Sequence, residues 1–307
     1  MMLQTLVNTL LLTSFVAPAG GEHSLKVDGV RREFRVHVPP CYDGRSALPV
    51  ILAFHGMSAN AKLLEKLSEL NCTADKYGYI VVYPNGTGVG PLRAVKSGAS
   101  LGKMEKRKPD DVCFVHAILN HLQRTMCIDS QRVYATGLSN GAMMCYRLAT
   151  EMPDRIAAIA PIGGALGTAA CKPAQPVSIM HFHGTCDNVL PFNGPRDTVL
   201  FQQSYHSVPS TIQMFVNAAG CSGPMEIEAI DGVADETRVC VQRHVNCENG
   251  AEVILVKIVG GGHQWPRHPI NLRYLGKATQ EIDANEMMVC FFQRHSLAER
   301  YAECSGQ

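Results

Sequence analysis

The stretch RVYATGLSNGAMMCYRLA, residues 132–149, decides the fold of this chain. It starts as a buried strand would, with β-branched and apolar residues, and it ends with the apolar spacing of a helix. Between the two, Ser139 stands in GLSNG, residues 137–141, which is the GxSxG pattern of a nucleophile elbow. We expect Gly137 and Gly141 to be required, because a side chain at either position would collide with neighbouring elements. The alternative interpretation is a glycine-flanked serine that caps the helix.

A serine hydroxyl is a weak nucleophile at neutral pH and needs a neighbouring base. Hydrolases with this elbow follow the chain order serine, acid, histidine. Asp187 follows the apolar strand predicted at 176–184, and His263 follows the strand predicted at 252–259 through three glycines. Because an open parallel sheet gathers its site at the carboxyl ends of its strands, we predict Ser139 as nucleophile, His263 as base and Asp187 as the orienting acid. The alternatives are a turn-forming aspartate and a polar loop histidine.

Acyl transfer also needs two backbone N–H groups that stabilise the oxyanion. One is expected at Asn140, directly after the nucleophile, and the other in the loop after an early buried strand. That loop is AFHGMSAN, residues 53–60, in which the N–H of Met57 is the candidate donor. His55 in the same loop is interpreted as a turn-packing histidine, because His263 fits the chain order of a base and His55 does not.

Strand and helix patterns alternate along the chain. This alternation predicts βα units, hence an α/β fold with a mostly parallel central sheet and helices on both faces. The polar stretch 87–109 is expected to be a surface loop, and Asp110 is expected to cap the helix that follows it. The predicted strands are 33–38, 48–54, 79–84, 132–136, 156–162, 176–184 and 252–259, and the predicted helices are 60–77, 111–124, 140–152, 209–219 and 279–295.

The first 19 residues are uncharged and mostly apolar, and they end in Ala17-Pro18-Ala19. This pattern predicts a secretory signal peptide at 1–19, with an N-terminal anchor as the alternative. Residues 20–307 show no internal repeat or low-complexity linker and are therefore expected to form a single catalytic domain. The chain is expected to be secreted.

The net charge of +1 gives no electrostatic case for a nucleic-acid partner, and no later segment is long and apolar enough to predict a membrane span. Twelve cysteines in an exported chain suggest a few disulfides. His181, His183 and Cys186 could suggest a metal site, but His183 belongs to the turn that positions Asp187. We therefore expect no metal, and the chain shows no phosphate-binding loop pattern.

The motifs FHG, VVYPNG, DDV, RVYATGLSNGAMM, AAIAPIGG, HGTCDNVLPF and GGGHQWP occur in this order over about residues 25–295. In this the chain resembles the secreted esterases grouped with polyhydroxybutyrate depolymerases, feruloyl esterases and acetylxylan esterases. The resemblance implies a single-domain α/β-hydrolase fold and hydrolysis of short-chain or aromatic acyl esters without a cofactor. By motif, it also implies the same three roles for Ser139, Asp187 and His263. It further implies a disulfide between Cys221 and Cys247, with Cys240 as a competing partner.

The chain departs from this family between its YPNG and DDV motifs. Family members usually carry a tryptophan there, whereas the single tryptophan of this chain is Trp265. The substrate therefore stays open between feruloyl or acetyl esters on a polysaccharide and hydroxyalkanoate oligomers. Two further alternatives are a serine peptidase of the same fold and a non-catalytic binding protein that retains the fold.

Overall fold

The computed structural model describes residues 20–90, 92–99, 110–170, 172–195, 204–267 and 273–302. The predicted signal peptide, 1–19, lies outside the described residues. Part of the predicted loop 87–109 also lies outside them.

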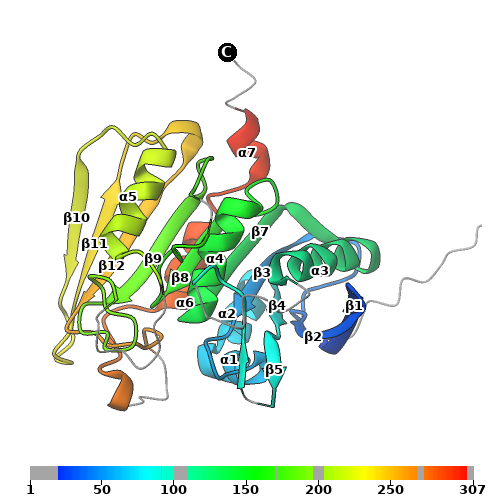
Figure 1. The fold of residues 1–307 in the computed structure, drawn as a ribbon. Helices are drawn as coiled ribbons and strands as arrows, with labels where there is room; N and C mark the ends of the chain where they lie inside the picture. Colours follow the sequence, from blue (N-terminus) through cyan, green and yellow to red (C-terminus); the bar gives the residue numbers. More distant parts are fainter. Residues whose placement is uncertain are drawn as a thin grey trace, which may run out of the picture.

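A single large sheet runs through the molecule (Figure 1). Its strands are β1 (Gly21–Val27), β2 (Val30–His37), β3 (Leu48–Phe54), β4 (Ile80–Pro84), β7 (Ile128–Leu138), β8 (Ala158–Ile162), β9 (Ser178–Gly184), β10 (Met225–Ile230), β11 (Arg238–His244) and β12 (Val253–Val259). They lie in the order β1-β2-β4-β3-β7-β8-β9-β12-β11-β10. The centre of the sheet, from β4 to β12, is parallel, and antiparallel strands close both edges. The mostly parallel sheet is thereby confirmed.

Helices cover both faces of the sheet. The helices are α1 (Ala61–Ser68), α2 (Leu70–Tyr77), α3 (Asp111–Thr125), α4 (Asn140–Glu151), α5 (Val208–Ala218), α6 (Ala284–Phe292) and α7 (Leu297–Ala302), with short 3-10 turns η2 (Glu248–Gly250) and η3 (Arg273–Leu275). Figure 1 shows α3, α4 and α5 in front of the sheet and α6 behind it.

Successive side chains of the central strands point alternately into two separate hydrophobic cores. On β3, Val50 and Leu52 belong to a core with residues of α3, α4 and α5, whereas Ile51 and Ala53 belong to one with residues of α1, α2 and α6. Successive side chains of a strand point to opposite faces, so a strand covered by helices on both sides must be apolar throughout. That is why the run LPVILAF predicts β3 with its observed bounds.

The secondary structure predicted from the sequence is wrong at one helix and at the edge strands. The helix expected at 60–77 is two helices, because Glu69 between them has φ 49°, in the left-handed region. The edge strands β1, β10 and β11 were not predicted. On β10 five of six residues are exposed, so no apolar pattern marks this strand in the sequence.

The polar stretch expected as a loop contains a small hairpin. Strands β5 (Thr87–Val89) and β6 (Leu92–Ala94) pair antiparallel and form a separate two-stranded sheet. Arg93 of β6 also bridges to Ala59, in the loop after β3. The hairpin is therefore attached to the carboxyl end of a central strand. The Asp110 cap of α3 is confirmed: its side chain accepts a hydrogen bond from the N–H of Val112.

The disulfide implied by the resemblance is confirmed. Cys221, after α5, is bonded to Cys247, which precedes η2, and Cys240 on β11 is free. The bridge closes a loop that contains β10 and β11 and ends just before β12. It therefore fastens the outer antiparallel strands to the helix layer.

Glu252, the residue before β12, is held by the end of α6. Its carboxylate accepts hydrogen bonds from Arg294 at 2.9 Å (Nε) and 3.0 Å (Nη2), and Nε2 of His295 lies 3.3 Å away. Burial alone would raise the pKa of Glu252, but the hydrogen bonds and charges of His295 and Arg294 outweigh it and lower the pKa from 4.5 to about 2.

We expect Glu252→Gln to lower the free energy of unfolding at pH 7 by about 1 kcal/mol, since the carboxylate is one-third exposed and its pairing is partly screened. Because the folded pKa is depressed, this contribution is full above pH 4.5 and is lost as pH falls toward 2. Urea unfolding at pH 7 and pH 2.5 checks it. A deficit of equal size at both pH values would contradict the charge argument.

Candidate active site

Ser139 stands at the corner where β7 ends and α4 begins. Its backbone has φ 60° and ψ −120°, a conformation that costs a non-glycine residue about 1–3 kcal/mol. Two hydrogen bonds hold this corner: the N–H of Ser139 donates to the carbonyl of Ile162 (2.9 Å), and its own carbonyl accepts from the N–H of Met143 (3.1 Å). The half-buried serine side chain is thereby placed at the carboxyl edge of the sheet.

Both glycines of the elbow are sterically required, as the sequence predicts. A Cβ on Gly141 would lie 2.0 Å from the carbonyl oxygen of Phe54, and one on Gly137 would lie 2.6 Å from the same atom. Both distances are far below van der Waals contact, and the obstacle is backbone that cannot rotate away. The end of β3 therefore presses directly against the elbow.

Asp187 and His263 are brought together from two other strands. Asp187 follows β9 and His263 follows β12, and Nδ1 of His263 lies 2.6 Å from Oδ2 of Asp187. The other carboxylate oxygen accepts the N–H groups of Val189 (2.8 Å) and Leu190 (2.7 Å). Burial alone would raise the pKa of Asp187, but the charge and hydrogen bond of His263 outweigh it and lower the pKa below 3.8. The carboxylate therefore stays ionised at neutral pH.

The imidazole of His263 lies beside the serine corner. A Cβ on Gly163 would lie 3.2 Å from Nδ1 of His263, so the ring packs against the backbone of this glycine. Gly163 follows Ile162, whose carbonyl holds the N–H of Ser139. The ring of His263 and the backbone hydrogen bond that holds the serine corner are thus attached to consecutive residues, Gly163 and Ile162, at the end of β8.

The glycines before His263 let two loops touch backbone to backbone. A Cβ on Gly184 would lie 2.2 Å from the carbonyl oxygen of Gly261, and one on Gly262 would lie 2.1 Å from that of Leu275. The N–H of Cys186 also donates to Gly261 (2.9 Å). The acid loop and the base loop are therefore fixed against each other, which sets the 2.6 Å contact between their side chains.

The loop after β3 passes directly over Ser139. A Cβ on Gly56 would lie 3.4 Å from Cβ and 3.9 Å from Oγ of Ser139. Met57, the predicted donor, is the next residue, and Asn140, the other predicted donor, is the first residue of α4. The structure thus places Met57 next to a residue that contacts the serine side chain, and Asn140 directly after the serine in the chain.

His55 is occupied by backbone groups. Its Nδ1 lies 2.7 Å from the carbonyl of Gly56, so this nitrogen carries the proton, and its Nε2 accepts the N–H of Gly86 (2.9 Å). The ring is buried, and burial lowers its pKa. A neutral ring with both nitrogens engaged fits the predicted turn-packing histidine.

Two supporting contacts were not predicted. Nε2 of His183 lies 2.8 Å from the carbonyl of Leu190 and 3.4 Å from Oδ2 of Asp187. Because a carbonyl oxygen can only accept a hydrogen bond, Nε2 of His183 carries a proton and donates it to the carbonyl of Leu190, in the loop that contains Asp187. The pattern HxHG predicts a histidine in a turn but not that it contacts Leu190 and Asp187. That contact depends on the path of the loop after β9.

The side chain of Asn140 is the second such contact. It accepts the N–H of Val95 (2.9 Å) and donates to Oγ of Ser97 (2.8 Å), and it is fully buried. It thereby ties the elbow to residues 95–97, just after β6. No local pattern connects positions so far apart, so only the structure reveals this link.

Trp265, two residues after His263, anchors the base loop. It is buried, and its Nε1 donates to Oδ1 of Asn285 (3.0 Å), whose amide donates in turn to the carbonyl of Ser68 (2.8 Å). The base loop is thus fastened to α6 and to the end of α1.

His181 and His183 contact each other, with Nε2 of His181 3.1 Å from Nδ1 of His183. Both rings are fully buried, and burial lowers the pKa of each. In the parts of the chain that the structure describes, no group of three or more His, Cys, Asp or Glu side chains is placed to hold a metal ion.

Comparison with known proteins assigns the chain to a family. The model of the family described as "Esterase PHB depolymerase" matches residues 33–215. The chain is 30% identical to the esterase NocK of Nocardia uniformis subsp. tsuyamanensis, over 86% of this chain and 80% of that protein. The matched region begins within β2 and ends within α5, and it includes Ser139 and Asp187.

Two longer relatives carry more specific names. Feruloyl esterase B of Piromyces equi is 28% identical, and the bifunctional acetylxylan esterase/xylanase XynS20E of Neocallimastix patriciarum is 25% identical, each over 76% of this chain. The chain spans only 42% and 31% of their respective lengths.

Among solved structures, the acetyl xylan esterase from Aspergillus awamori superimposes with a TM-score of 0.60. It covers 90% of this chain and 100% of its own, at 14% sequence identity. A likeness at this identity concerns the fold, which is that of the α/β-hydrolases. With a family model matching more than half of its length, the chain belongs to the PHB-depolymerase-type esterases, a family of carboxylic ester hydrolases.

Proposed function

We propose that this chain hydrolyses carboxylic esters through a Ser139 acyl-enzyme, with His263 as general base and acid and Asp187 as its orienting partner. The observation that carries the proposal is the 2.6 Å contact between His263 and Asp187 beside the elbow serine. Membership of a serine-elbow esterase family supports it. The strained backbone of Ser139 supports it too, because such strain is retained where a side chain must be held for chemistry.

The reaction has two halves. Oγ of Ser139 bonds to the ester carbonyl carbon while its proton passes to Nε2 of His263, and the carbonyl π electrons move onto oxygen. The N–H groups of Met57 and Asn140 stabilise that oxyanion. The intermediate collapses, the leaving alkoxide takes the proton from His263, and the acyl group stays on Ser139. A water molecule, deprotonated by His263, then attacks the acyl carbon in the same way. The bond to Oγ breaks, Oγ takes the proton back from His263, and the carboxylic acid is released.

Asp187 supports this cycle electrostatically. Its carboxylate fixes the ring so that Nδ1 of His263 holds the proton and Nε2 faces the serine corner. When the ring becomes positive, the neighbouring anion stabilises it. The N–H groups of Val189 and Leu190 bind the other oxygen, so the carboxylate cannot rotate away.

For the substrate, we propose short-chain or aromatic acyl esters, of the feruloyl or acetyl kind carried by polysaccharides. The names of two relatives, a feruloyl esterase and an acetylxylan esterase, support this class. Hydroxyalkanoate oligomers are the second candidate, supported by the description of the matching family.

We also propose that the protein is secreted, with residues 1–19 as its signal peptide and the remainder, 20–307, as a single catalytic domain. The apolar, uncharged N-terminal sequence supports export. The Cys221–Cys247 disulfide supports it independently, because such bonds persist in oxidising compartments.

Among the described residues, none of the helices is long and apolar enough to cross a membrane.

The nucleophile can be tested with a fluorophosphonate probe. We expect the wild type to be labelled and Ser139→Ala not to be labelled, with a loss of at least ~10³-fold in kcat on an aryl ester. Ser222→Ala removes an exposed serine near the disulfide and is the matched control, which should label as the wild type does. Equal labelling of wild type and Ser139→Ala would remove Ser139 from the mechanism, whereas no labelling of either protein would favour a binding protein.

The substrate class can be tested with a panel of feruloyl, acetyl and hydroxybutyrate esters and a matched peptide amide. We expect the acetyl or feruloyl ester to show the highest kcat/KM, with Ser139→Ala as the blank. Highest activity on hydroxybutyrate oligomers would favour the second candidate. Turnover of the peptide as fast as of the esters would favour a peptidase.

The contact of His183 with the acid loop predicts a positioning role. We expect His183→Phe to lower kcat about ten- to hundredfold with KM little changed, because a small displacement of the acid misorients the base. His183→Gln, which can still donate toward the carbonyl of Leu190, should recover part of the loss. The low-field proton resonance of the His263–Asp187 bond reports geometry directly and should weaken in His183→Phe. An unchanged resonance with unchanged kcat would exclude this role.

A further inference from the structure

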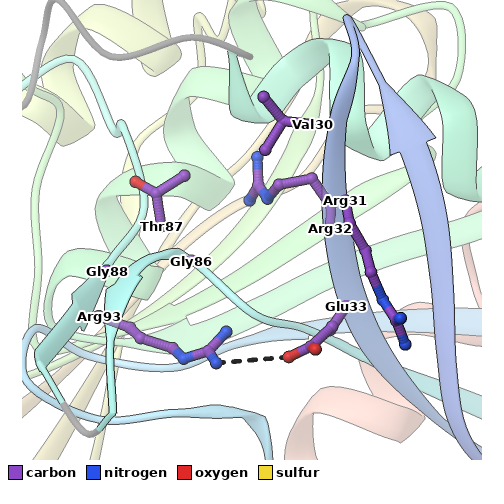
Figure 2. Close-up of a pocket in the computed structure, with 8 residues that line it drawn as sticks. All are labelled: Val30, Arg31, Arg32, Glu33, Gly86, Thr87, Gly88 and Arg93. Atoms are coloured by element: carbon purple, nitrogen blue, oxygen red, sulfur yellow. Dashed lines mark hydrogen bonds and ion pairs between the residues drawn. The ribbon is translucent and has the colours of Figure 1, made fainter.

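A pocket of about 400 Å³ lies between the first residues of β2 and the β5–β6 hairpin (Figure 2). We call it the arginine pocket. It is lined by Val30, Arg31, Arg32, Glu33, Gly86, Thr87, Gly88 and Arg93. Its volume is ample for a small ligand and its waters.

Two residues that line the pocket have a buried polar side-chain atom without a hydrogen-bond partner. These atoms are Nη1 of Arg32 and Oγ1 of Thr87. Arg32 is only 4% exposed, and its Nη2 is already used by the carbonyl of Asn85 (2.9 Å) and by Asp111 (2.5 Å). An unsatisfied buried donor costs about 1–3 kcal/mol, more when it is charged, so these atoms indicate a group that completes them from the pocket.

The pocket also carries surplus positive charge. Three guanidinium groups line it, against the carboxylates of Glu33 and, behind Arg32, Asp111. Figure 2 marks a single ion pair among the lining residues, from Arg93 to Glu33, and at 3.3 Å it is long. Guanidinium groups match the two-oxygen geometry of carboxylate and phosphate. The pocket is therefore suited to an oxyanion.

A ligand larger than a bare ion can be accommodated. A second pocket of about 520 Å³ shares Arg31, Glu33 and Arg93 with the first and extends to Lys62 and Asn60. The two pockets adjoin at these shared residues and are together called the groove. Glu22 and Arg35, which pair with each other at 2.8 Å, also line the second pocket. An anionic group in the arginine pocket could thus carry a polar body that lies along this groove.

The pocket shares its walls with the loop over the serine. The carbonyl of Arg93 accepts the N–H of Ser58 (2.9 Å), and the N–H of Gly86 donates to His55 (2.9 Å). Ser58 and His55 flank Gly56 and Met57, the residues over the Ser139 side chain. The groove therefore lies beside the oxyanion loop.

We propose that the arginine pocket binds an oxyanion, a carboxylate or phosphate group, against Arg93 and Arg32, with Thr87 completing its hydrogen bonds. The group has two possible sources: a carboxylate on a sugar acid, or free inorganic phosphate. The proposal does not depend on ester hydrolysis, so it is tested separately from the catalytic one.

The test is calorimetric binding to Ser139→Ala protein at low salt, with D-glucuronate, inorganic phosphate and neutral D-glucose as probes. We expect glucuronate or phosphate to bind at least about tenfold more tightly than glucose, and Arg93→Gln to weaken that binding about tenfold, the size of one charge-assisted hydrogen bond. Lys26→Gln is the matched control. It removes a charge opposite Arg31 on the same hairpin but outside both pockets, and it should leave binding unchanged.

The variant Thr87→Val distinguishes whether the hydroxyl of Thr87 binds the ligand or stabilises the fold. Replacing an unpartnered hydroxyl with a methyl group of similar shape should leave the unfolding temperature without ligand unchanged or raised, while anion binding weakens several-fold. A lowered unfolding temperature with unchanged binding would mean that the hydroxyl has a structural partner, and would overturn its place in the site.

The two possible sources of the anion, a sugar acid and free phosphate, predict different orders of affinity. Tighter binding of glucuronate indicates a carboxylate carried by a sugar, and tighter binding of phosphate indicates a free anion; either supports the site. Binding of both anions no tighter than glucose, or unaffected by Arg93→Gln, overturns the proposal. Because Ser139→Ala is used throughout, these results stand whether or not Ser139 is the nucleophile.

Discussion

The contact on which the site depends is steric: the carbonyl oxygen of Phe54, at the end of β3, against the two glycines of the elbow. A Cβ on Gly141 would come within 2.0 Å of that oxygen. This closeness lets the loop after β3 pass over Ser139, with Gly56 against the serine side chain and Met57, the proposed donor, next in the chain. A larger residue at the elbow would separate the nucleophile from the loop proposed to stabilise its oxyanion. The strained backbone of Ser139 is tolerated because packing on both sides leaves it no alternative.

The same principle recurs where the acid meets the base. Gly184 and Gly262 allow backbone contacts that a Cβ would block at 2.2 Å and 2.1 Å. The 2.6 Å contact between Asp187 and His263 is therefore fixed by rigid loops and does not depend on two mobile side chains. Such preorganisation removes the entropy cost of assembling the pair in each turnover. The motif GGGH is explained by this packing.

Much of the fold could be predicted, since buried parallel strands must be apolar throughout and helices keep their 3.6-residue spacing. The bounds of β3 and the cap of α3 follow from this. Strand β10 could not be predicted, because its side chains are exposed and only its backbone pairing defines it. For the site, chain order predicted the meeting of Asp187 with His263, but not the contacts of His183 and Asn140. Those contacts depend on loop paths, which local patterns do not encode.

The hairpin β5–β6 connects three features that the chain keeps far apart. Arg93 bonds to the loop over the serine, the residues just after β6 bond to the side chain of Asn140, and Arg93 also lines the arginine pocket. An anion held there would bind the segment that braces both the elbow and the oxyanion loop. Differences in substrate preference between this chain and its relatives should therefore arise first in this hairpin, because the elbow and its glycines leave no room for variation.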